Sequence, residues 1–172
     1  MTVLPIRTVP DPILRKKTHR VPAIDKSVKK LINDMLETVH ADEGRAGLAA
    51  PQVGVSLRIT VINVNPEEDE DIILINGEIV RRKGERIISE GCLSIPGYTG
   101  EVKRAESVTA KGLDINGKEF RIKAEGLLSQ ALEHELDHLD GVLYIDKLEN
   151  KDSLRKIQPE PPEAGPEDAA EK

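Results

Sequence analysis

The sequence predicts an α+β fold in which antiparallel or mixed β-sheets pack around a C-terminal helix, with an amphipathic helix near the N-terminus. Apolar residues recur every three or four positions in two stretches, residues 28–39 and 128–139, as they do on one face of a helix. Between these stretches, short apolar runs are separated by turn residues, which is typical of β-strands. A chain of 172 residues with 38% apolar and 33% charged residues fits one soluble globular domain.

Near the N-terminus, residues 10–14 predict a short helical segment, which precedes the first long helix. Asp25 or Ser27 is suited to cap that helix, because a side-chain oxygen can accept a hydrogen bond from one of its first backbone N–H groups. We expect the helix to stop at Gly44. One apolar stripe runs along it and should face a core: Val28, Leu31, Ile32, Met35, Leu36 and Val39.

The middle of the chain is dominated by predicted strands. We place them at residues 57–65, 71–76, 78–83, 85–89, 101–105, 107–113 and 119–124. The dipeptide Asn116-Gly117 indicates a hairpin between the last two. A second helix should run from about residue 125 to residue 140 and end near Gly141, and a further strand is expected at residues 142–146.

Composition divides the chain into a body, residues 1–150, expected to form a single domain, and an acidic, proline-rich tail, residues 151–172, expected to be disordered. Residues 158–172 hold five acids, one base and four prolines, a net charge of −4, so we expect this part to be disordered. The other 157 residues carry 26 acids and 24 bases, which does not indicate a nucleic-acid surface. Without a membrane-length apolar run or a signal-peptide pattern, and with one cysteine, the expected location is a reducing cytoplasm.

The second helix contains the most specific motif of the chain, His134-Glu-Leu-Asp-His138. At about 100° per residue, His134, His138 and Glu135 fall within a sector of about 100°, beside a face of leucines. Two imidazoles and a carboxylate at the edge of a buried face are costly unless something satisfies them. This spacing is a recurring device for binding one metal ion with both imidazoles while the glutamate acts on a water molecule.

A catalytic metal site usually needs a third protein ligand. Glu149 follows the motif too closely to act as the distant glutamate of thermolysin-like proteases, and Tyr144 stands where metzincins have their third histidine. His19 and His40 have no supporting motif. Cys92 is the remaining good donor, in the glycine-containing stretch Ser89-Glu-Gly-Cys-Leu-Ser-Ile-Pro-Gly-Tyr98. A lone cysteine is more often a small buried apolar residue, but here we expect a metal ligand.

Three motifs together resemble peptide deformylase: Gly47-Leu-Ala-Ala-Pro-Gln52, Glu90-Gly-Cys-Leu-Ser94 and His134-Glu-Leu-Asp-His138. The resemblance extends over roughly residues 3–148. It implies a hydrolase that removes the formyl group from the N-terminal formyl-methionine of newly synthesised bacterial or organellar proteins. It further implies one divalent metal ion, most often Fe²⁺, with Zn²⁺, Ni²⁺ or Co²⁺ as substitutes. Contact with the ribosome would be transient, and we expect a monomer.

Carried over motif by motif, the resemblance makes Cys92, His134 and His138 the metal ligands and Glu135 the acid/base. Gln52 and the backbone of Leu93 would stabilise the developing oxyanion. Gly47 and Glu90 would position the substrate backbone. From their places beside the motifs, we expect Ile88, Leu127 and Ala131 to line the pocket for the methionine side chain.

Two positions depart from the usual family pattern. Arg45 stands where the first motif commonly has glycine, and Glu133 where glutamine often precedes the first histidine. Two other functions share the helical motif: a metallopeptidase that cuts internal peptide bonds, and a binding module in which the metal has only a structural role.

Overall fold

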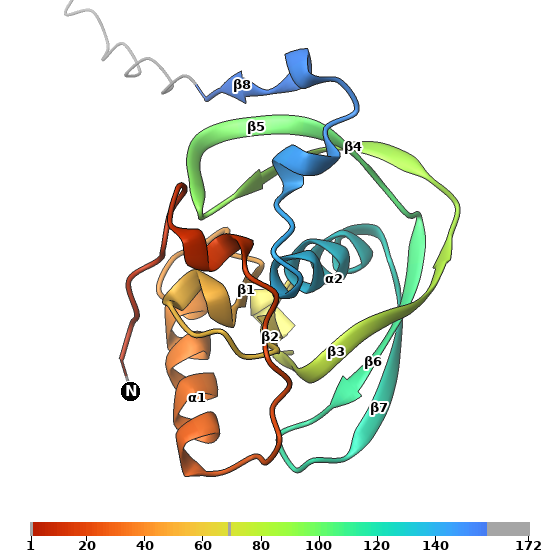
Figure 1. Ribbon diagram of the computed structural model, residues 1–172. Helices are drawn as coiled ribbons and strands as arrows, with labels where there is room; N and C mark the ends of the chain where they lie inside the picture. The colour runs from red at the N-terminus through yellow and green to blue at the C-terminus, as the bar shows by residue number, and fades with distance from the viewer. Residues whose placement is uncertain (1, 69, 158–172) are drawn as a thin grey trace, which may run out of the picture.

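The computed structural model describes residues 2–68 and 70–157 and confirms the α+β architecture (Figure 1). Helix α2 (Gly126–Leu139) lies at the centre of the molecule. Strands β3 (Ile72–Lys83), β6 (Ser107–Leu113) and β7 (Glu119–Glu125) curve around one side of it. Strands β4 (Arg86–Cys92) and β5 (Ile95–Arg104) pass over it. Helix α1 (Lys26–His40) lies on the other side. The expected central helix and amphipathic N-terminal helix are therefore both present.

Helix α1 begins at the predicted cap and ends earlier than predicted. The Asp25 carboxylate accepts a hydrogen bond from the Val28 N–H at 3.0 Å, as an N-cap residue does. The helix ends at His40 instead of Gly44, and the Arg45 guanidinium donates to the Thr38 carbonyl of its last turn at 2.6 Å. The apolar stripe packs into a core with strands β1, β2 and β3; its buried members are Val28, Ile32, Met35 and Val39.

Five antiparallel strands form the larger sheet, in the order β1-β2-β3-β6-β7. Their bounds are Gly47–Ala49 (β1), Ile59–Ile62 (β2), Ile72–Lys83 (β3), Ser107–Leu113 (β6) and Glu119–Glu125 (β7). The β6–β7 hairpin is confirmed, and Gly117 has the positive φ of 79° that its turn requires. Strand β1 was not predicted.

Two strands predicted separately, at residues 71–76 and 78–83, form the single strand β3. The chain passes through Asn76 and Gly77 with register shifts in its pairing to β6 and does not turn back. A side chain at Gly77 would lie 2.9 Å from the Leu136 side chain of α2. The glycine thus marks a close approach of β3 to the central helix, not a break between strands.

The smaller sheet has the order β4-β5-β8, with bounds Arg86–Cys92 (β4), Ile95–Arg104 (β5) and Arg155–Lys156 (β8). Strand β5 begins six residues before the prediction. Residues 151–157, which we assigned to the tail, form a 3₁₀ turn (Lys151–Ser153) and strand β8, which pairs with β5. Residues 158–172 lie outside the described residues, so disorder of that part remains a prediction.

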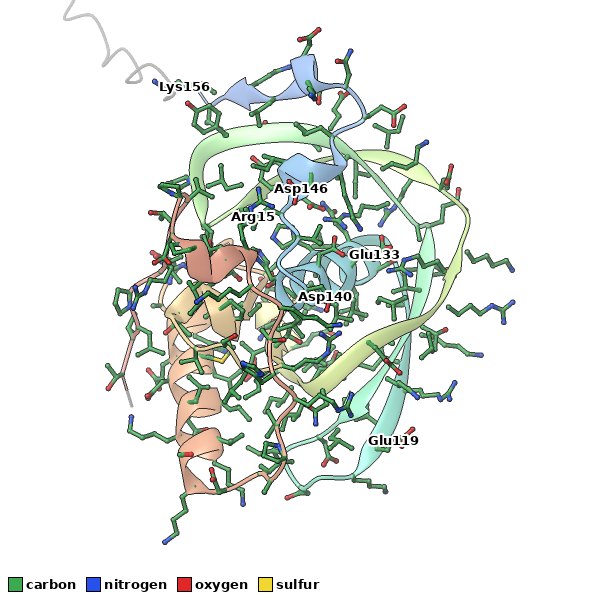
Figure 2. All side chains as sticks on the ribbon, in the orientation of Figure 1. Arg15, Glu119, Glu133, Asp140, Asp146 and Lys156 are labelled. Atoms are coloured by element: carbon green, nitrogen blue, oxygen red, sulfur yellow. The ribbon has the colours of Figure 1, made fainter. Side chains whose placement is uncertain are left out.

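The strand predicted at residues 142–146 is wrong: the chain forms a 3₁₀ turn, Tyr144–Lys147. Asp146 explains the difference, because its carboxylate accepts from the Leu143 N–H at 3.0 Å and its own N–H donates to the Leu143 carbonyl at 2.9 Å. Arg15, in the 3₁₀ turn Pro12–Arg15 near the predicted N-terminal helical segment, pairs with Asp146 (Figure 2). In the part of the chain that the structure describes, no helix has the length and apolar character needed to cross a bilayer.

Gly141, just after α2, should be a sensitive position. It has φ of 73°, and a side chain there would overlap the backbone carbonyl of Arg15. We expect Gly141→Ala to lower the free energy of unfolding by about 3 kcal/mol, the sum of left-handed strain and overpacking. Gly117→Ala is the matched control, because Gly117 has similar φ and only an ordinary contact, and should cost about 1 kcal/mol. The free energy of unfolding is measured by urea denaturation, and an equal loss in the two variants would contradict the predicted overlap with Arg15.

Candidate metal centre

The structure brings Cys92, His134 and His138 together. The two histidines lie one turn apart on α2, and Cys92 ends β4. Cys92 Sγ lies 3.3 Å from His138 Nε2, and the two histidine Nε2 atoms lie 3.2 Å apart. One donor atom from each residue falls within 4.8 Å of the others. The sequence predicted this convergence of residues more than 40 positions apart; their role as ligands remains a proposal.

The donor set suits a divalent transition metal. Two imidazole nitrogens and one sulfur leave a position open for water or substrate, as in catalytic sites. Glu135 lies beside the group, and its Oε2 is buried without a hydrogen-bond partner among the described residues. A buried carboxylate oxygen without a partner is costly, so the arrangement fits a centre that holds an ion and a water molecule.

Glu135 is held close to strand β1. A side chain at Gly47 would lie 3.1 Å from Glu135 Cγ and 3.2 Å from Oε1, so the glycine leaves room for the glutamate. Burial raises the pKa of Glu135 to about 7. A carboxylate with a pKa near neutrality can both accept and return a proton, which is what general acid–base catalysis requires.

A buried ion-pair network orients His134. Its Nδ1 lies 2.7 Å from Glu90 Oε2, so Nε2 is the nitrogen that faces Cys92 and His138. Arg104, 2% exposed, donates to both carboxylate oxygens of Glu90, at 2.5 and 3.1 Å, and to Asp137 at 2.6 Å. Burial by itself would raise the pKa of Glu90, but the hydrogen bonds from His134 and Arg104 outweigh it and lower that pKa to about 2.

This network gives Glu90 an orienting role in addition to the predicted one. Its carboxylate contacts Arg104, His134 and Gln130, and Glu90 also lines the cavity described below, so its substrate-binding role stays a prediction. Arg104 was not singled out by the sequence analysis as a site residue. The available signal was a cationic side chain at a position where alternation along β5 predicts an inward direction.

Gln52 lies close to Cys92, in the 3₁₀ turn Ala50–Val53. Its Oε1 accepts from the Ala49 N–H at 2.9 Å, which fixes the direction of the amide. The Nε2 group then lies 3.2 Å from Ser94 Oγ and 3.7 Å from Cys92 Sγ. The structure therefore points a hydrogen-bond donor towards the candidate metal centre.

A cavity of about 490 Å³ opens from the metal centre. Its lining includes the predicted residues Gly47, Gln52, Glu90, Leu93, Leu127, Ala131 and Glu135. Ile88 is not among them, and its place beside the methionine side chain stays a prediction. It pairs with Val102 across β4 and β5 and packs in an apolar cluster that also contains Leu14, Leu143 and Cys92.

The two unusual residues do not contact the candidate ligands. The Glu133 carboxylate is buried and accepts from Arg82 Nε at 2.9 Å and from the Ala105 N–H at 3.0 Å (Figure 2). Arg45 lines the cavity, but its guanidinium is directed to the Thr38 carbonyl and to Asp42, at 2.7 Å. Arg45 thereby ties the segment before β1 to the end of α1.

The other candidates for a third ligand lie elsewhere. His40 Nε2 is 2.8 Å from Asp71, and His19 pairs with Leu57. The Glu149 N–H donates to the Glu101 carbonyl at the edge of the smaller sheet. Within residues 2–68 and 70–157, the group of Cys92, His134 and His138 is the one that could hold an ion.

Comparison with known proteins agrees with the geometry. The family model of polypeptide deformylase matches residues 3–153. A peptide deformylase of Dehalococcoides mccartyi is 56% identical over 160 residues, 93% of this chain and 95% of that protein. One from Halothermothrix orenii is 53% identical over 149 residues, covering 86% and 95%. A peptide deformylase crystal structure from Legionella pneumophila superimposes with a TM-score of 0.83 at 47% identity, covering 87% of this chain and 88% of that one.

Enzymes of this family depend on a metal and remove the N-formyl group from newly synthesised proteins. The match spans the larger sheet, strands β4 and β5, both helices and all three motifs. The chain belongs to the polypeptide deformylase family.

Proposed function

We propose that the chain removes the formyl group from N-terminal formyl-methionine with one divalent metal ion held by Cys92, His134 and His138. The observation that supports this most is the convergence of the three donor atoms within 4.8 Å, beside a buried Glu135 and at one end of a cavity. When bound, such a metal lowers the pKa of water towards about 7 and polarises a carbonyl group.

Glu135 is the proposed acid/base. It accepts the proton of the attacking water and later returns it to the departing methionine amine, because hydrolysis of an amide needs both transfers. A separate charge develops on the formyl oxygen as the carbonyl carbon becomes tetrahedral. The Gln52 amide, fixed by Ala49, and the Leu93 backbone N–H are the proposed donors to this oxyanion. Loss of one such donor typically lowers the rate by about 10²–10³.

Fe²⁺ is the proposed native metal, with Zn²⁺, Ni²⁺ or Co²⁺ able to occupy the same donors. A thiolate and two neutral imidazoles suit these borderline cations and leave the site with a single positive charge. Burial and the charge of His134 lower the pKa of His138 well below its usual value, whereas for His134 the hydrogen bonds to Cys92 and Glu90 outweigh burial and raise its pKa. Binding of the metal by His134 Nε2 would therefore displace a proton from that ring.

The cavity supports a place for the methionine side chain. Leu127 and Ala131 lie on the same face of α2 as His134, two turns and one turn before it, and both line the cavity. We propose that the methionine side chain packs between them while the peptide backbone runs past Gly47, which lines the same cavity.

The proposed setting is the cytoplasm of a bacterium, as a monomer that contacts ribosomes transiently. The substrates of the family are newly synthesised chains, and the relatives named above are bacterial. The net charge of −4 over residues 158–172 would repel ribosomal RNA, so we propose a weaker contact than a basic C-terminal segment would give.

The first test separates this reaction from cleavage of internal peptide bonds. Anaerobically purified, Fe²⁺-loaded protein should release formate from formyl-Met-Ala and leave an unformylated peptide intact. Glu135→Gln should keep the metal and the fold but lower kcat by about 10²–10⁴, because the proton acceptor is lost. Cleavage of the unformylated peptide alone would show a metallopeptidase. Full activity of the variant would remove Glu135 from its proposed role.

A second test addresses the orientation of His134. Glu90→Gln removes the charge between Arg104 and His134, and we expect the affinity for Zn²⁺, measured by competition with a chelator, to fall about 10–100-fold. Glu133→Gln is the matched control. Glu133, on α2, is as buried as Glu90, but its carboxylate contacts Arg82 instead of a candidate ligand. Identical affinities for both variants would contradict the orienting role.

A further inference from the structure

The C-terminal end of the described chain contributes to the wall of the substrate cavity. Ile157 lines this cavity together with residues of the metal centre, although it lies 65 positions beyond Cys92 in the sequence. Its side chain is 53% exposed, and two other exposed large apolar residues, Tyr98 and Leu127, line the same cavity. Apolar side chains gathered at the mouth of a cavity indicate a contact surface more strongly than isolated ones do.

Strand β8 fixes the place of Ile157. Arg155 and Lys156 pair with Thr99 and Tyr98 of β5, and the Ile157 N–H donates to the Gly97 carbonyl at 2.8 Å. Gly97 has φ of 83°, and a side chain built there would meet nothing within 4 Å. Strand β8 therefore holds the Ile157 side chain beside the open space at Gly97.

The separation between Ile157 and the metal centre is comparable to the distance from the formyl carbon to the substrate residues that follow the methionine. Cys92 pairs with Ile95, and Gly97 lies two residues further along β5, roughly 7 Å at about 3.4 Å per residue. Two interstrand spacings of about 5 Å each separate β4 from β8, because β5 lies between them. In an extended peptide, the Cα atoms of the second and third residues lie roughly 6 and 10 Å from the formyl carbon. Ile157 therefore lies within reach of these residues and beyond the methionine.

We propose that Ile157 is a specificity-determining residue that contacts apolar side chains at the second or third position of the formylated peptide. The inference rests on the proposed deformylase activity and extends it to the part of the substrate beyond methionine. Apolar contact at this end adds binding energy without touching the reacting atoms. Its effect should therefore appear in KM for longer peptides, with kcat unchanged.

The test compares Ile157→Ala with Ile87→Ala. Ile87 is a matched control: it is the same residue type, 52% exposed, in the same three-stranded sheet, and it does not line the cavity. Formate release is measured from formyl-Met-Ala, formyl-Met-Ser-Ser and formyl-Met-Leu-Phe. We expect the unaltered protein to prefer the apolar tripeptide over the serine tripeptide. Ile157→Ala should reduce that preference about three- to tenfold through KM.

The remaining outcomes are equally specific. Formyl-Met-Ala turnover should stay within about twofold in both variants, and Ile87→Ala should keep the original preference. An unchanged preference in Ile157→Ala, or an equal loss on all three substrates, would overturn the inference and leave the deformylase activity standing. A change in molecular mass on size-exclusion chromatography with Ile157→Ala would assign the side chain to a contact between copies. Failure of the unaltered protein on formyl-Met-Ala would overturn the proposed function itself, and this inference with it.

Discussion

The buried guanidinium of Arg104 holds together the parts of the molecule on which the centre depends. It comes from the end of β5, binds Glu90 of β4 through two hydrogen bonds and reaches Asp137 of α2 through a third. A cation that is 2% exposed is tolerated only when its donors are satisfied, so the three elements must keep this relative position. Glu90 in turn contacts His134 Nδ1, which directs the Nε2 side of the ring towards Cys92.

The convergence of the three candidate ligands could be predicted because each of them can be recognised within a short stretch of sequence. His134 and His138 are one helical turn apart in the sequence, and Cys92 is the single thiol of the chain. Helix α1, strand β6 and the β6–β7 hairpin also follow from short-range patterns, because their periodicity and turn residues lie within a few positions. For these elements, local preference and tertiary contacts agree.

Features decided by distant partners could not be predicted in the same way. Strand β8 is two residues long and exists through its pairing with β5. Ile88 pairs with Val102 and packs in a cluster with residues from both ends of the chain, which its place beside a motif does not indicate. The roles of Glu90 and Arg104 depend on residues from separate strands and from α2, which no local pattern reveals. The strand expected at residues 142–146 failed because the Asp146 side chain favours a turn over extended backbone.

The candidate ligands come from two elements that lie far apart in the sequence. Cys92 ends β4, the first strand of a hairpin in the smaller sheet, and His138 lies 46 positions further on in the central helix. An ion bound by both would act as a cross-link, closing a long loop and restricting the unfolded chain. Supply of the ion would then influence the lifetime of the folded protein as well as its turnover. A cell short of the metal would hold less of the enzyme, in addition to holding it in a less active form.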